Sequence, residues 1–247
     1  MVELKNVSVS AGKTKILDGI DLKLVPETVT ALIGKNASGK STLLSCLTKE
    51  RKYSGSISFS DKDISLMSHR ERAQLISLLP QKLPCPDISG EHLVRLGRTP
   101  YLDLGRHFTE EDLKSCEAAI EMAGAKELTE KKVSLMSGGE RQKIYLAMLL
   151  AQDTPFIALD EPTSYMDARH EREFSTLIAD IVKKHRKTAL VVMHDLTRAV
   201  EIADNIAILD GGKIIFYGTA TEAAESGLIE STFGVKAYSC DGIKIYR

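Results

Sequence analysis

The chain has 247 residues, of which 43% are hydrophobic and 27% are charged, a composition that excludes an intrinsically disordered protein and favours one large α/β domain. Its 33 basic and 34 acidic residues leave a formal charge of -1, which argues against a global attraction to nucleic acid or to an anionic membrane. The longest apolar stretch, residues 144–151, falls far short of the ~20 residues that cross a bilayer, and residues 1–5 lack the features of a secretion signal. We therefore expect a cytoplasmic chain with reduced cysteines and no nucleic-acid partner.

The first 30 residues carry apolar side chains near alternate positions, which predicts short antiparallel strands. Residues 29–33 are apolar and partly β-branched and predict a buried strand, and residues 56–59 predict another short one.

Residues 34–41 match the spacing of a phosphate-binding loop, and Leu43, Leu44 and Leu47 recur at helical spacing behind it. The backbone N–H groups of such a loop wrap the phosphates of a nucleotide. Lys40 would reach the terminal phosphates, and the Ser41 hydroxyl would bind magnesium. The predicted ATP-binding residues of the loop are Gly34, Lys35, Asn36, Ala37, Ser38, Gly39, Lys40, Ser41 and Thr42.

Residues 84–135 are helical in character, because Thr109 is followed by three acidic residues, as at a helix N-terminus. We expect a helical lobe, inserted at roughly residues 83–152 within a single domain of residues 1–247. Ser137 and Glu140 then form a capping-box pattern, and the two glycines between them leave backbone N–H groups open at the positive end of a helix dipole. This helix start is either a well-made cap or a second anion site.

The α/β alternation resumes with a predicted strand at residues 156–159, an amphipathic helix through residues 174–182 and a strand at residues 189–193. A hairpin over residues 206–217 follows, turned at residues 210–212. The basic run at residues 183–187 is interpreted as a solvated helix end.

Three polar stretches follow apolar strands and therefore converge at the carboxyl edge of one sheet. They are the phosphate loop, Asp160-Glu161 and His194. Asp160 is suited to bind magnesium, and Glu161 is the candidate to orient and deprotonate an attacking water. The alternative for Asp160-Glu161-Pro162 is ordinary turn chemistry, and for His194 a structural histidine.

In this order, the motifs resemble the nucleotide-binding subunit of ATP-binding cassette (ABC) transporters. Ser137-Gly138-Gly139-Glu140 is similar to the family signature, Gln81 after Leu79-Pro80 to its glutamine loop, and Ser164-Tyr165-Met166-Asp167 to its D-loop. The resemblance implies an α/β phosphate-loop NTPase core of mostly parallel sheet, with an N-terminal antiparallel β subdomain and an inserted helical lobe.

The resemblance also implies a head-to-tail homodimer that holds each ATP between the phosphate loop of one subunit and Ser137, Gly138 and Gly139 of the other. Asp167 would tie the two sites together. Hydrolysis would drive polytopic permease subunits at the inner face of the cell membrane, supplied by an external substrate-binding protein. The catalytic set it implies is Glu161, His194, Gln81 and Lys40, and the magnesium set is Ser41, Gln81 and Asp160.

Residues 96–101, Gly105-Arg106 and residues 137–142 further resemble the ATPases of importers for iron-siderophores, haem and cobalamin. The alternatives are an importer ATPase for another substrate, a soluble ABC ATPase of the iron-sulfur assembly type, or a small-molecule phosphoryl transferase. Ala11 stands where the family usually has an aromatic that stacks on adenine, so we expect weak adenine binding and poor discrimination against GTP. Ala37 and Lys35 replace a glycine and a proline common in the family's loop, and Ala37 is strained if its φ is positive.

Overall fold

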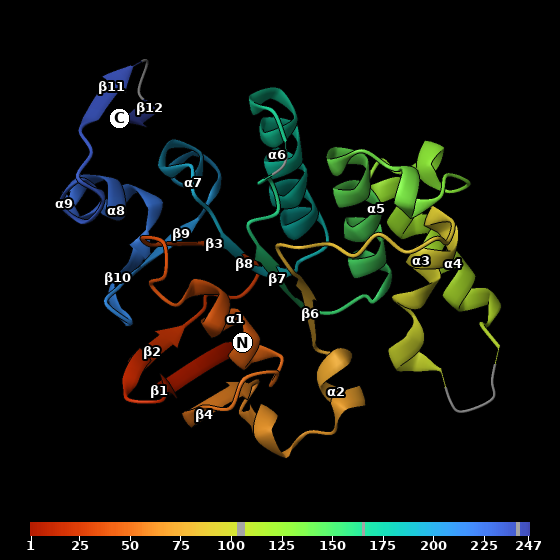
Figure 1. The fold of residues 1–247 in the computed structure, drawn as a ribbon, viewed down its shortest axis with the longest axis horizontal. Helices are drawn as coiled ribbons and strands as arrows, with labels where there is room; N and C mark the ends of the chain where they lie inside the picture. The colour runs from red at the N-terminus through yellow and green to blue at the C-terminus, as the bar shows by residue number, and fades with distance from the viewer. Residues whose placement is uncertain (103–106, 165, 241–242) are drawn as a thin grey trace.

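The computed structural model describes residues 1–102, 107–164, 166–240 and 243–247. Tyr165 of the D-loop stretch and Gly105-Arg106 lie outside these residues. A six-stranded sheet in the spatial order β10-β9-β3-β8-β7-β6 runs through the centre of the molecule (Figure 1). Five of its strands are parallel, and β10 is antiparallel to β9. The strands are β3 (Val29–Ile33), β6 (Ile76–Leu79), β7 (Phe156–Asp160), β8 (Thr188–Val192), β9 (Asn205–Asp210) and β10 (Lys213–Thr219).

Both faces of this sheet are covered, which explains why strands β3, β7 and β8 are apolar at nearly every position. Successive side chains of a strand point to opposite faces. Ala31 and Ile33 accordingly join one buried cluster, with α5 and α6, while Leu32 joins a second, with α1 and the antiparallel sheet. The predicted strands at residues 29–33, 156–159 and 189–193 are therefore found, the last displaced by one residue at each end.

The N-terminal part forms the predicted antiparallel sheet, with strand order β2-β1-β4-β5. Its strands are β1 (Val2–Ala11), β2 (Thr14–Lys23), β4 (Ser54–Phe59) and β5 (Lys62–Asp63). Helix α1 (Lys40–Leu47) buries its leucines between this sheet and the central one, and it follows β3 directly through the phosphate loop. The short α2 (His69–Ala73) leads into β6.

Helices α3 (Gly90–Leu96), α4 (Glu110–Met122) and α5 (Gly138–Ala151) lie together at one side of the molecule, away from the antiparallel strands (Figure 1). Short 3-10 turns connect them, at Thr99–Tyr101, Lys126–Leu128 and Val133–Leu135, and a further one, Ile64–Leu66, follows β5.

A buried ion pair fastens these three helices to one another. The Arg98 guanidinium lies 2.9 Å from the Asp112 carboxylate of α4 and donates to the Ala151 carbonyl at the end of α5, at 3.0 Å. Its charge also lies 3.9 Å from the centre of the Tyr101 ring, a cation–π contact. Both charged groups are buried, so the pair is satisfied by several partners at once. Arg98 and Tyr101, which contribute to the finer family resemblance, thus have a structural role.

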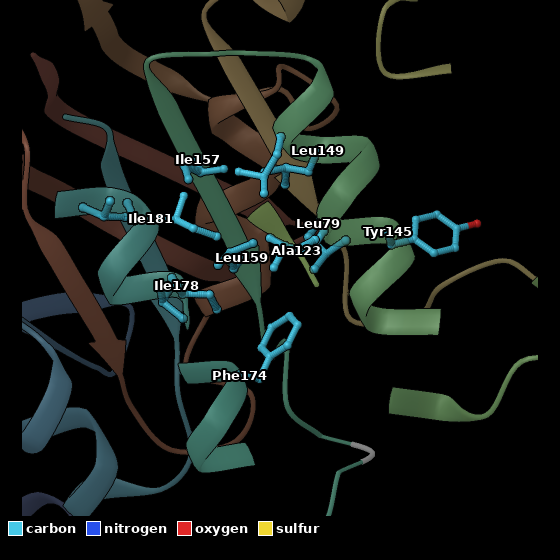
Figure 2. Close-up of a cluster of buried hydrophobic side chains, with 14 of the residues drawn as sticks. Leu79, Ala123, Tyr145, Leu149, Ile157, Leu159, Phe174, Ile178 and Ile181 are labelled. Carbon is cyan, nitrogen blue, oxygen red and sulfur yellow. The ribbon is translucent and has the colours of Figure 1, made fainter. Parts of the chain in front are cut away.

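Helix α6 (Ala168–Lys184) packs its apolar face on β7 and β8, as its periodicity predicted. Figure 2 shows Phe174, Ile178 and Ile181 of this helix facing Ile157 and Leu159 of β7. One prediction about its C-terminal end was wrong. Lys187, interpreted as part of a solvated helix end, is only 7% exposed, since its ammonium bonds the Asp153 carboxylate at 2.8 Å and the Thr154 carbonyl at 3.0 Å.

The remaining elements follow the sheet toward the C-terminus: α7 (Leu196–Ile202), the predicted β9–β10 hairpin, α8 (Ala220–Glu225), α9 (Leu228–Phe233), β11 (Ala237–Cys240) and β12 (Ile243–Tyr246). The β11–β12 hairpin packs against α7 and had no counterpart in the sequence analysis. Among the residues that the structure describes, no helix combines the length and the apolar character that a bilayer span requires.

Candidate functional site

The loops that follow β3, β7 and β8 leave the sheet at one edge. Pairing places Leu32 of β3 beside Val192 of β8, and Asp160 of β7 beside the same Val192. The next residues of each strand therefore enter one space, which holds the phosphate loop, Glu161 and His194. The structure brings together the three stretches that the sequence analysis expected at this edge.

The phosphate loop wraps around its own lysine. Lys40 is 6% exposed, and its ammonium donates to the carbonyls of Gly34 at 2.7 Å and Lys35 at 3.0 Å. Burial lowers the pKa of Lys40, while the carboxylates of Glu161 and Asp160 oppose that shift. Ala37 has a φ of 62°, the strained conformation expected if its φ was positive, and Gly39 a φ of 108°, which favours glycine.

Asp160 and Ser41 form the part of the site that fits a divalent cation. Asp160 is 8% exposed, and its Oδ1 has no hydrogen-bond partner among the described residues. Burial raises the pKa of this carboxyl, and the Ser41 hydroxyl beside it opposes that shift. A carboxylate oxygen and a hydroxyl facing one space are the donors that magnesium prefers, and a bound cation would satisfy the unpartnered oxygen. The residues present therefore fit magnesium.

Glu161 is the centre of a cluster of hydrogen bonds. Its Oε1 contacts Nε2 of His194, and its Oε2 accepts from Nε2 of Gln81 and, at 3.1 Å, from the hydroxyl of Ser164. The backbone of Glu161 has a φ of 49°, a conformation uncommon for residues other than glycine. Such strain, of order 1–3 kcal/mol, is found mostly at functional sites. Sequence spacing carries no signal for this φ, nor for the contact with Ser164.

The second predicted anion site is the N-terminal end of α5. Ser137 caps the helix, with its hydroxyl accepting from the Glu140 backbone at 3.3 Å and the Glu140 carboxylate accepting from the Ser137 backbone at 2.8 Å. Lys131 holds the same carboxylate at 2.8 Å, and together these contacts lower the pKa of Glu140 to about 2. A side chain added at Gly139 would meet open space, so the fold itself does not require a glycine there.

The phosphate loop and the tip of α5 line separate hollows in this chain. One, of about 360 Å³, is formed by residues 36–42, Glu161 and Ile16. The other, of about 640 Å³, is formed by the tip of α5, Asp167 and the start of α6, among others. Asp167 caps α6, with its carboxylate accepting from two backbone N–H groups and lying 2.8 Å from Nδ1 of His170. A single chain therefore does not bring Ser137, Gly138, Gly139 and Asp167 to its own phosphate loop.

Comparison with known proteins decides the family. The profile of the ABC transporter family matches residues 17–164. The chain belongs to the ABC transporter family. It is 34% identical to the petrobactin import ATP-binding protein FpuD of Bacillus anthracis, over 94% of this chain and 86% of that protein. It is 35% identical to the hemin import ATP-binding protein HmuV of Pseudomonas fluorescens, over 96% of this chain and 93% of that protein.

Solved structures agree on the fold. The ATP-binding cassette MJ0796, in a dimer bound to ADP and Pi, superposes with a TM-score of 0.77 at 24% identity, covering 89% of this chain and 99% of that one. The predicted fold class and the predicted resemblance to nucleotide-binding ABC subunits are both confirmed. The chain is an ABC ATPase, a nucleotide-binding subunit rather than a small-molecule phosphoryl transferase.

Proposed function

We propose that this chain hydrolyses ATP as the motor subunit of an importer for an iron-siderophore or haem cargo. The observation that carries the catalytic part is the cluster of Glu161, His194 and Gln81 at the edge of the phosphate loop. The cargo rests on the relatives, whose names give petrobactin and hemin import.

The residues of the phosphate site divide the work of phosphoryl transfer. Backbone N–H groups of residues 34–42 would hold the phosphates, and Lys40 would reach the terminal ones. Ser41, Asp160 and Gln81 would hold magnesium, and when bound it would neutralise charge on the phosphates. Because phosphoryl transfer needs mainly positioning and charge stabilisation, no covalent intermediate with the protein is required.

Glu161 would orient the attacking water and accept its proton. The Glu161 carboxylate is held on one oxygen by His194 and on the other by Gln81, so it has one fixed orientation. A bound γ-phosphate would compete for Gln81, which makes this glutamine the side chain suited to sense the nucleotide. His194 would contact the γ-phosphate from the opposite side.

Each ATP-binding site would be completed by a second copy of the chain, arranged head to tail. Support comes from the two hollows, because the glycine-led tip of α5 and the phosphate loop open on different parts of one chain. The related cassette MJ0796 forms a dimer in its solved structure. Closure of such a dimer, at the inner face of the membrane, would drive polytopic permease subunits loaded by an external substrate-binding protein.

Glu161→Gln tests both the chemistry and the dimer. This change keeps the shape of the side chain but removes the base, so turnover should fall at least ~100-fold. With Mg-ATP the variant should accumulate as a dimer, measured by light scattering. Glu91→Gln is the matched control, since the Glu91 carboxylate accepts from Arg95 on the exposed face of α3, away from this cluster, and it should keep near-normal turnover.

Near-normal turnover of Glu161→Gln would remove its proposed role, and a monomer at saturating Mg-ATP would remove the dimer. The importer assignment has a separate test, which is co-purification from solubilised membranes. A polytopic permease and an iron-chelate binding protein are expected, and recovery of iron-sulfur assembly factors instead would contradict it.

A further inference from the structure

His194 depends on its backbone for its position. Its ring contacts the Glu161 carboxylate, and no other side chain of the described residues hydrogen-bonds to that ring. The residue lies in a short connection between Val192, the last residue of β8, and Leu196, the first residue of α7. A side chain with one polar partner is held mainly by the backbone that carries it, so the placement of His194 depends on how firmly α7 is fixed.

The first turn of α7 is held at two points. Within the helix, the Asp195 carboxylate accepts from the Arg198 backbone N–H at 2.9 Å and so caps the N-terminal end. From outside the helix, the Thr197 hydroxyl accepts from the Tyr246 backbone N–H at 3.1 Å, which ties α7 to β12. Because Thr197 and Tyr246 are 49 positions apart, the second contact fixes α7 to a distant part of the chain.

The hairpin that carries Tyr246 is itself anchored. Its base is closed by two backbone hydrogen bonds between Lys236 and Arg247, at 2.7 and 3.0 Å. The Lys244 ammonium of β12 donates to the Ala224 carbonyl near the end of α8. The hairpin therefore gives α7 a support that is fixed to another helix.

The Tyr246 side chain also lies next to the residues that would act on ATP. It lines a hollow of about 680 Å³ together with Glu161, His194 and Thr197, and it packs against the buried apolar cluster that α5 and α6 form with the sheet. Its hydroxyl is buried and has no partner among the described residues. Burial, with the Glu230 carboxylate, raises the pKa of Tyr246 to about 12, so the hydroxyl stays protonated. The contribution of Tyr246 is therefore its ring.

We propose that Tyr246 is a positioning residue for ATP hydrolysis, which holds α7 and thereby keeps the His194 ring against Glu161. The inference rests on the proposed function, which gives His194 and Glu161 their roles. Among the described residues, none of the phosphate loop lines the hollow that Tyr246 lines. Loss of the ring should therefore disturb the alignment of the catalytic side chains while the phosphates are still bound. A misplacement of about 1 Å is enough to slow a reaction up to ~100-fold.

The experiment measures steady-state hydrolysis of Mg-ATP and thermal unfolding of the full chain. Tyr246→Ala should lower kcat about tenfold and change KM less than about twofold. Tyr246→Phe should keep the parent kcat, since it retains the ring and removes only a hydroxyl that has no partner. Tyr238→Ala is the matched control, because it removes an exposed tyrosine of the same hairpin, and it should change neither kcat nor KM.

The position of His194 also has a direct readout. The NMR signal of its isotope-labelled ring, identified by its loss in His194→Gln, reports the surroundings of the ring without turnover. Tyr246→Ala should shift and broaden this signal, whereas Tyr246→Phe and Tyr238→Ala should leave it as in the parent. A merely structural role for Tyr246 would lower the unfolding temperature without moving the signal.

Thr197→Val keeps the test decisive if Tyr246→Ala does not fold. It removes the hydroxyl that accepts from β12 but nearly keeps the size of the side chain, and it should lower kcat about threefold at unchanged KM. Parent kcat in folded Tyr246→Ala, or in Thr197→Val where Tyr246→Ala does not fold, would overturn the inference, as would an unmoved His194 signal. A parent chain that hydrolyses no ATP would instead contradict the proposed function, and the His194 signal would still show whether Tyr246 holds that ring.

Discussion

The phosphate loop and the tip of α5 both turn backbone N–H groups toward an anion, yet they are built in opposite ways. In the loop, Lys40 and Ser38 are buried, the Ser38 hydroxyl has no partner among the described residues, and Ala37 has a positive φ. At the tip, Ser137 is exposed and a complete capping box satisfies the cap side chains. The phosphate loop thus has buried groups and strained backbone, whereas the tip of α5 is exposed and its cap is satisfied.

This difference separates what each half does. Unpartnered buried groups and strained backbone cost about 1–3 kcal/mol each, and a bound nucleotide would relieve part of that cost within a single chain. The tip has no comparable strain or unpartnered group to relieve. An anion there would be stabilised only by the open N–H groups and the helix dipole. Changes in the loop should therefore alter the ATP affinity of a monomer, whereas changes at the tip should leave that affinity unchanged and alter association.

The largest effect is expected from Lys40→Ala, which removes the one buried cation of the loop. The variant should lose ATP affinity by at least ~100-fold, since hydrogen bonds to a charged phosphate are strong and this one lies in a buried site. Hydrolysis should be undetectable. Calorimetric titration of the dilute, monomeric protein measures the affinity.

Lys35→Ala is the matched control for that experiment. Lys35 belongs to the same loop but is exposed, so its charge is screened and its loss should change the affinity less than about threefold. Equal losses in the two variants would show that net charge, rather than the buried position of Lys40, determines binding.

The two halves also differ in how far the sequence predicted them. The strand ends at Ile33, Asp160 and Val192 were predictable to within one residue, because apolar runs followed by polar residues have few other interpretations. The capping box of Ser137 and Glu140 was equally readable, since its pattern is local. Features that depend only on neighbouring residues could therefore be predicted from the sequence.

Features that depend on distant partners were missed. Lys187 is buried because Asp153, 34 positions away, pairs with it, and no local pattern contains that information. The positive φ of Glu161 occurs where the chain turns directly after β7. The buried pair of Arg98 and Asp112 depends on the packing of three helices. The β11–β12 hairpin is short and packs on α7, so its strands carry little periodicity of their own.

An intermediate effect is expected from Gly139→Ala, which tests whether the tip serves association only. Apart from its chain neighbours and its own helix backbone, no atom of the described residues lies within 4 Å of the added methyl, and alanine favours a helix over glycine, so stability should rise by up to about 1 kcal/mol. In the dimer the methyl would lie against the partner's nucleotide and should reduce turnover at least ~10-fold. Monomer ATP affinity should be unchanged.

Gly97→Ala gives the contrasting glycine. A methyl there would lie 2.2 Å from the Met148 carbonyl oxygen, so this variant should lose stability through the helical part of the fold. Thermal unfolding separates the two cases. Normal turnover with a stable Gly139→Ala would show that no nucleotide packs on the tip.

The smallest effect concerns the pH dependence of the tip itself. Lys131 and the Ser137 backbone lower the pKa of Glu140 from 4.5 to about 2, so its contribution to stability is complete above about pH 5 and is lost as the pH falls toward 2. Glu140→Gln preserves the capping geometry but removes the charge. The stability difference between the two proteins, measured by urea unfolding, should be below about 1 kcal/mol at pH 7, because the pair with Lys131 is partly exposed. It should shrink steadily below pH 5. A stability difference that is constant from pH 7 to pH 3 would mean that the charge of Glu140 does not stabilise the protein. The hydrogen bonds of the capping box would then be sufficient to order the tip of α5.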